Sequence, residues 1–146
     1  MRAKILKQYP PNYEQIRSFF PVHQHEPIFA FGDYIYTPHA EEIPEDIIVH
    51  EHVHLWQQKQ YQTPEIWWNK YIFDKEFRKH EETEAFNEQY KWVKKNLGTK
   101  ASEEALFEYA NNLSSNLYRL NITYNEASKA IKKYGKAGNK TIPQKR

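Results

Sequence analysis

The residues best suited to do chemistry together are His50, Glu51 and His54, which fit the pattern H-E-x-x-H. Residues four apart on a helix lie on one face, with Cβ atoms about 5–6 Å apart, so the two imidazoles can bind one metal ion. Glu51 lies one step round the helix and can reach a water molecule bound to that ion, where it would act as general base. The spacing therefore predicts a catalytic metal centre on a helix.

The segment that carries these residues has the features of a buried helix. Pro44 suits the first helical position, and Glu45 and Asp46 place acids in the first turn. Apolar residues follow on several sides of the predicted helix: Ile47, Ile48, Val49, Val53, Leu55 and Trp56. We therefore expect a core helix from about residue 44 to residue 60, in which the polar side chains need partners.

A catalytic zinc ion usually has three protein ligands and one open position. The chain has no cysteine, so the third ligand must be another histidine or a carboxylate. One acidic segment offers four candidates: His80, Glu81, Glu84 and Glu88. We predict Glu84, because the small Ala85 beside it lets two helices approach closely. Glu81 and His80 remain alternatives. Glu88 could accept a hydrogen bond from the ring nitrogen of a metal-binding histidine without binding the metal itself.

The two motifs together, His50-Glu51-x-x-His54 and Glu84-Ala85-x-x-Glu88, resemble those of the gluzincins, the thermolysin-like zincins. The longer pattern is similar to small uncharacterised phage and bacterial metallopeptidases, through the stretches 29–36, 50–58, 68–71, 77–85 and 113–127. This resemblance covers most of residues 10–132. It implies that His50, His54 and Glu84 bind Zn²⁺ and that Glu51 is the base. The chain has no room for the second domain of large gluzincins, and Gln60 stands where metzincins have a third histidine.

The expected fold is α+β and mainly α. We predict one zincin-like domain over residues 1–135 and a flexible basic tail over residues 136–146. A β-hairpin of runs 28–31 and 34–37, joined by Gly32-Asp33 in a type II′ turn, precedes the H-E-x-x-H helix and should be the only sheet. Its edge could receive an extended peptide.

Further helices are predicted before and after the H-E-x-x-H helix, and those that follow it should form a helical bundle. They are a short one over residues 13–20, one started by Thr63-Pro64, one from about residue 75 to Gly98 with Asp74 as cap, one opened by Ser102, and one opened by the capping box of Thr123 and Glu126 and stopped by Gly135.

The predicted function is a zinc-dependent hydrolase, a small metallopeptidase or amidase, acting on a peptide or protein substrate. The resembling stretch 113–127 includes or borders Tyr118, Arg119 and Tyr124, which are for that reason the candidates for stabilising the tetrahedral intermediate. The alternative is a non-catalytic, metal-stabilised interaction module of phage or host. A tightly closed four-ligand site would indicate this alternative.

Composition limits the other partners. The net charge of +2 argues against a nucleic-acid partner, which requires a far more basic face. No apolar run reaches the ~18 residues of a membrane span, and the start of the chain lacks the apolar region of a signal peptide. We therefore expect no membrane partner and a cytoplasmic location, in the host cytoplasm if the protein is phage-encoded. The oligomeric state is left open.

Of the remaining histidines, His52 should be structural and His23, His25 and His39 solvated.

Overall fold

The computed structural model of the chain describes residues 2–22 and 27–134. Over these residues the chain is mainly helical with one small sheet, which confirms the predicted α+β, mainly α class. Its elements in order are β1 (Lys4–Leu6), α1 (Tyr13–Phe19), β2 (Phe29–Phe31), β3 (Tyr34–Tyr36), α2 (Glu45–Gln58), α3 (Pro64–Phe73), α4 (Lys75–Leu97), α5 (Thr99–Ser114) and α6 (Tyr124–Lys133). His23, His25 and the predicted tail lie outside the described residues.

The sheet has the strand order β1-β3-β2. Strands β2 and β3 form the predicted antiparallel hairpin, and Gly32 adopts φ +67°, the left-handed conformation that a type II′ turn requires at its first position. Strand β1 pairs in parallel with β3, so that Lys4 lies opposite Tyr34. The prediction that the hairpin would be the only sheet structure was therefore wrong by one strand.

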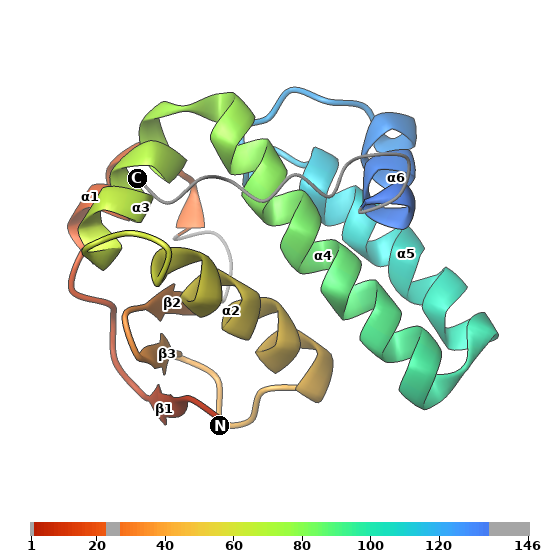
Figure 1. Cartoon of the computed structure of the whole chain (residues 1–146), viewed down its shortest axis with the longest axis horizontal. Coiled ribbons are helices and arrows are strands. Elements are labelled where there is room, and N and C mark those ends of the chain that lie inside the picture. Colours follow the sequence, from red (N-terminus) through yellow and green to blue (C-terminus); the bar gives the residue numbers. More distant parts are fainter. Residues whose placement is uncertain (1, 23–26, 135–146) are drawn as a thin grey trace.

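Helix α2 lies between the sheet and helix α4 (Figure 1). Ile48 and Leu55 on its sheet side pack with Ala30 and Ile35 in one apolar cluster. Gln58, at the end of α2, accepts a hydrogen bond from Gly32 N (2.8 Å) and donates one to the carbonyl oxygen of Ala30 (2.8 Å). The hairpin is therefore fixed to the helix that carries the H-E-x-x-H motif.

The predicted helix caps are confirmed. The side chains of Thr63, Asp74 and Thr123 accept hydrogen bonds from the first turns of α3, α4 and α6, and Glu126 completes a capping box with Thr123. Helix α5 begins at Thr99, three residues before the predicted Ser102. The reason is Gly98, whose φ of +98° ends α4 and allows the next helix to start at once.

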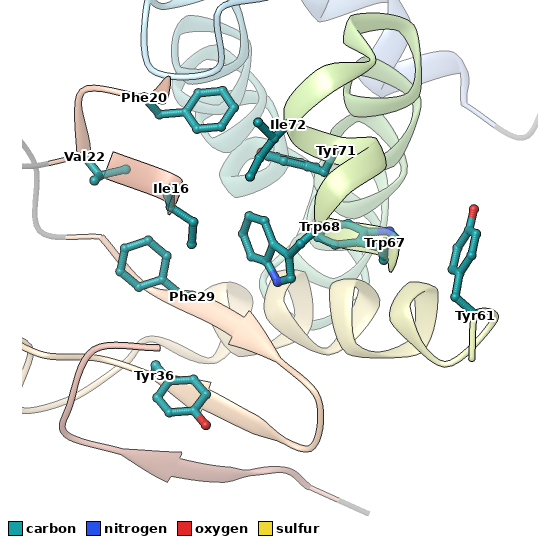
Figure 2. Close-up of a cluster of buried hydrophobic side chains, with 10 residues drawn as sticks. All are labelled: Ile16, Phe20, Val22, Phe29, Tyr36, Tyr61, Trp67, Trp68, Tyr71 and Ile72. Carbon is teal, nitrogen blue, oxygen red and sulfur yellow. The ribbon is translucent and has the colours of Figure 1, made fainter. Parts of the chain in front are cut away.

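Two larger apolar clusters hold the helices in place. One joins α4, α5 and α6 and includes Phe86, Leu113 and Ile131. The other is rich in aromatic rings and joins α1 and the hairpin to α3, with Trp68 and Phe29 close to each other (Figure 2). Arg78 of α4 links α4 to this second cluster, because its guanidinium donates to the carbonyl oxygens of Tyr71 (2.7 Å) and Tyr118 (2.8 Å).

Among the described helices, none combines the length and apolar character needed to cross a membrane.

Candidate metal centre

Helix α2 brings the imidazoles of His50 and His54 together, as the sequence predicts. Their ring centroids are 4.8 Å apart, and the two Nε2 atoms are 3.1 Å apart. Both residues are buried, with 6% and 5% of their surface exposed. They lie on the side of α2 away from the sheet, because Ile48 and Leu55 occupy the sheet side.

Glu82 of α4 completes the cluster. Its Oε1 lies 3.1 Å from His50 Nε2, and its Oε2 lies 3.2 Å from His54 Nε2. The Tyr71 hydroxyl donates to the same Oε2 at 2.5 Å. His50, His54 and Glu82 form the single group of three or more potential metal-ligating residues among the described residues, with all their ligand atoms within 4.8 Å of one another.

Glu82 was not among the predicted third ligands, and Glu84, the predicted one, lies elsewhere. Glu84 Oε1 accepts a hydrogen bond from Gln57 Nε2 at 2.8 Å. Two residues along a helix correspond to a rotation of about 200°, so Glu82 and Glu84 point to different sides of α4. The group of residues that could hold a metal ion therefore contains Glu82 and not the predicted Glu84.

The two alternative ligands also have other partners. Glu81 is buried and accepts hydrogen bonds from Trp67 Nε1 (2.8 Å) and from His80 Nδ1 (2.9 Å). His80 Nε2 lies 3.1 Å from the hydroxyl of Tyr134. Glu88, predicted to hold a histidine, instead forms an ion pair with Lys91 at 2.8 Å.

Two glutamines that the sequence did not assign hold the histidines. His50 Nδ1 donates to Gln89 Oε1 at 2.9 Å, and His54 Nδ1 donates to Gln57 Oε1 at 2.8 Å. With Nδ1 protonated, each Nε2 is the ring atom that can bind a metal ion or a second proton.

The three side chains offer ligand atoms that lie close enough together to share one metal ion. Ligand atoms bound to zinc at about 2.0–2.1 Å at tetrahedral angles lie about 3.3 Å from one another. Here the two Nε2 atoms are 3.1 Å apart, and each lies near a different oxygen of Glu82: His50 Nε2 is 3.1 Å from Oε1 and His54 Nε2 is 3.2 Å from Oε2. Two ring nitrogens and a carboxylate are donors that zinc accepts, and a His₂Glu set leaves a fourth position for water.

The charges of the cluster favour a cation between the ligands. Burial by itself would lower the pKa of His54, but the charge and hydrogen bond of Glu82 raise this pKa to about 10. Burial would likewise raise the pKa of Glu82, but the charge of His54 and the hydrogen bonds from both imidazoles hold it well below its usual range. A proton or a metal ion is thus stabilised at the same place.

A cavity of about 280 Å³ opens onto the cluster. His50, His54 and Glu82 line this cavity, and so does Glu51. Burial raises the pKa of Glu51 above its usual range, although the charges of His50 and His54 act in the opposite direction. The cavity walls near α1, α3 and β2 are apolar and include Ile16, Phe20, Val22, Phe29 and Trp68 (Figure 2).

Of the three candidates for stabilising an intermediate, Tyr118 alone lines this cavity. Burial and the charges of Glu82 and Glu51 raise its pKa well above the usual value, so its hydroxyl stays protonated. Arg119 instead donates to the carbonyl oxygen of Phe19 at 3.1 Å, and the ring of Tyr124 packs against Phe107.

The other histidines and the hairpin edge have structural partners. His52 Nε2 accepts a hydrogen bond from Ala3 N at 3.1 Å, in agreement with the prediction that it is structural. His39 is exposed, as predicted, and its Nε2 lies 3.0 Å from the hydroxyl of Tyr9. At the outer edge of β2, the Ala30 carbonyl accepts from Gln58 and Trp68, so this position cannot pair with an added peptide strand.

Comparison of the chain with protein-family models, with curated proteins and with solved structures gives no match.

Proposed function

We propose that the protein is a zinc-dependent hydrolase, a small metallopeptidase or amidase, whose metal is held by His50, His54 and Glu82. The observation that carries this proposal is the convergence of these three ligand groups at a cavity that also contains Glu51. A purely structural zinc site is closed by four protein ligands, whereas a catalytic one keeps a position open.

The roles of the residues follow from their positions. Zinc, when bound, would act as a Lewis acid and lower the pKa of its water to about 7. Glu51 takes the proton of the attacking water and passes it to the leaving amine. Its burial favours this exchange, because a carboxylate whose pKa is raised toward neutrality both accepts and releases a proton more readily. Tyr118 lines the same cavity and donates a hydrogen bond to the developing oxyanion.

A second function is supported by the burial of the ligands. Only 3% of the surface of Glu82 is exposed, and this residue joins α4 to two histidines of α2. A metal ion at this place would tie the two helices together without catalysing a reaction. In that case the protein would be a metal-stabilised interaction module.

The two functions are separated by the variant Glu51→Gln. Because Glu51 is not a ligand in the proposed mechanism, this variant should keep one equivalent of zinc and lose hydrolysis of a broad peptide library, as measured by mass spectrometry. His54→Ala should lose both zinc and hydrolysis. Full activity in Glu51→Gln would contradict the mechanism, and absence of turnover in the zinc-loaded wild type would favour the interaction module.

A further inference from the structure

Each histidine of the candidate metal centre is the end of a hydrogen-bonded chain. The first chain runs from His50 Nδ1 to Gln89 Oε1 (2.9 Å) and from Gln89 Nε2 to Asp46 Oδ2 (2.8 Å). It ends on Tyr109, whose hydroxyl donates to the same Asp46 oxygen at 2.5 Å. The chain connects α2, α4 and α5.

The second chain has the same order of chemical groups. His54 Nδ1 donates to Gln57 Oε1 (2.8 Å), and Gln57 Nε2 donates to Glu84 Oε1 (2.8 Å). The chain ends on this carboxylate of α4. Each chain therefore runs from an imidazole through an amide to a carboxylate, although the residues come from different parts of the sequence.

The outer carboxylates fix the direction of every hydrogen bond in these chains. A carboxylate only accepts, so the amide NH₂ of Gln89 must face Asp46, and the amide NH₂ of Gln57 must face Glu84. Each amide oxygen then faces a histidine Nδ1, which must carry a proton. The Nε2 atom of each ring is thereby left to bind the metal.

We propose that Gln57 and Gln89 are positioning residues, which set the tautomer and the ring orientation of His54 and His50 so that both bind the metal through Nε2. This inference rests on the metal site of the proposed function but not on hydrolysis. In each chain the group that accepts the hydrogen bond from the histidine Nδ1 is a neutral glutamine amide and not a carboxylate. The imidazoles are therefore less electron-rich than carboxylate-bound ones, and more positive charge remains on the metal.

Gln58 provides a matched control for the substitutions. It follows Gln57 on the same helix and is equally buried, at 2% exposure each, but its amide binds the hairpin and not a histidine. We expect Gln57→Leu and Gln89→Leu to weaken zinc binding about 10–100-fold, and Gln58→Leu to change it by less than about twofold. Zinc affinity would be measured by competition with a chelating dye, after thermal unfolding has shown that each variant is folded.

Exchanging the amide and the carboxylate between positions 89 and 46 tests the direction of the hydrogen bond that joins Gln89 to Asp46. Gln89→Glu alone places two carboxylates side by side, at the position where Gln89 Nε2 now lies 2.8 Å from Asp46 Oδ2. The double variant Gln89→Glu with Asp46→Asn restores one donor and one acceptor there, so zinc affinity should recover relative to Gln89→Glu. A role of Gln89 in packing alone predicts no recovery.

The nitrogen that binds the metal is identified in the wild-type protein, without any substitution. ¹⁵N NMR spectra of the zinc-loaded protein should show a protonated Nδ1 and a metal-bound Nε2 in both His50 and His54. Coordination through Nδ1, or glutamine-to-leucine variants that bind zinc as tightly as Gln58→Leu, would overturn the inference. A wild-type protein that binds no zinc would overturn the proposed function as well, whereas a protein that binds zinc without hydrolysis would leave the positioning role intact.

Discussion

The rotation of α4 about its axis places Glu82, and not Glu84, beside the two histidines. The buried residues of this helix include Arg78, Glu82, Ala85, Phe86 and Gln89, spaced by three or four. Glu84 lies outside this stripe and is only partly buried. The sequence does contain a signal for Glu82, since it precedes the apolar pair Ala85 and Phe86 by three and four residues.

Zinc binding should therefore depend far more on Glu82 than on Glu84. Glu82→Gln removes the carboxylate from the ligand set and should lower zinc affinity by at least about 100-fold. Glu84→Gln still offers an oxygen to Gln57, so its affinity should fall by much less. Zinc content measured by atomic absorption after dialysis checks both variants. Loss of zinc in Glu84→Gln and its retention in Glu82→Gln would restore Glu84 as the ligand.

At the scale of elements, the helix ends follow from local chemistry. Thr63, Asp74 and Thr123 occupy cap positions because their side-chain oxygens satisfy free amide groups in the first turn. Each cap residue lies only three residues before the amide group that donates to it, so the sequence suffices to predict the caps. Strand β1 has no such signal, because it exists only through its parallel pairing with β3, about 30 residues away.

The cap of α4 gives a prediction at this scale. Asp74 Oδ1 accepts a hydrogen bond from Phe77 N at 3.0 Å. Asp74→Ala should lower the free energy of unfolding by about 1 kcal/mol, whereas Asp74→Asn should have a much smaller effect, because asparagine is an equally good cap. Urea unfolding followed by circular dichroism measures both values. Equal destabilisation by alanine and asparagine would show that the charge of Asp74 matters and the cap does not.

At the scale of the whole molecule, the candidate metal centre joins parts of the chain that are distant in sequence. Its ligands come from α2 and α4, and the cavity beside it is also lined by residues of α1, β2, α3 and the segment before α6. Binding of zinc to the folded state alone should therefore stabilise the whole domain, by about 2.7 kcal/mol when free zinc is at 100 times its dissociation constant.

The stability of the metal-free form should fall as the pH rises above about 6.5, while the additional stabilisation by zinc should grow. The pKa of His54 is raised from 6.5 to about 10, because Glu82 outweighs the effect of burial. A raised pKa stabilises the metal-free fold fully below about pH 6.5, and this contribution is lost as the pH rises toward about 10. Zinc competes with protons for the same Nε2 atoms, so its stabilising effect grows over that range.

Thermal unfolding from about pH 6 to pH 9, with either a chelator or excess zinc, measures both trends. The gap between the melting temperatures of the two forms should widen as the pH rises. In His54→Gln the decline of the metal-free form should be weaker. A metal-free wild type that becomes more stable across this range would contradict the prediction.

The sequence by itself determined the mainly helical class, the hairpin with its glycine turn, the caps, and the pair of histidines on one face of α2. All of these depend on residues within about one or two helical turns of each other, where spacing fixes geometry. Only the tertiary structure decided that Glu82 joins the pair and that Gln57 and Gln89 hold the rings. Those contacts depend on how far α4 is rotated and shifted against α2, which packing of the whole core sets.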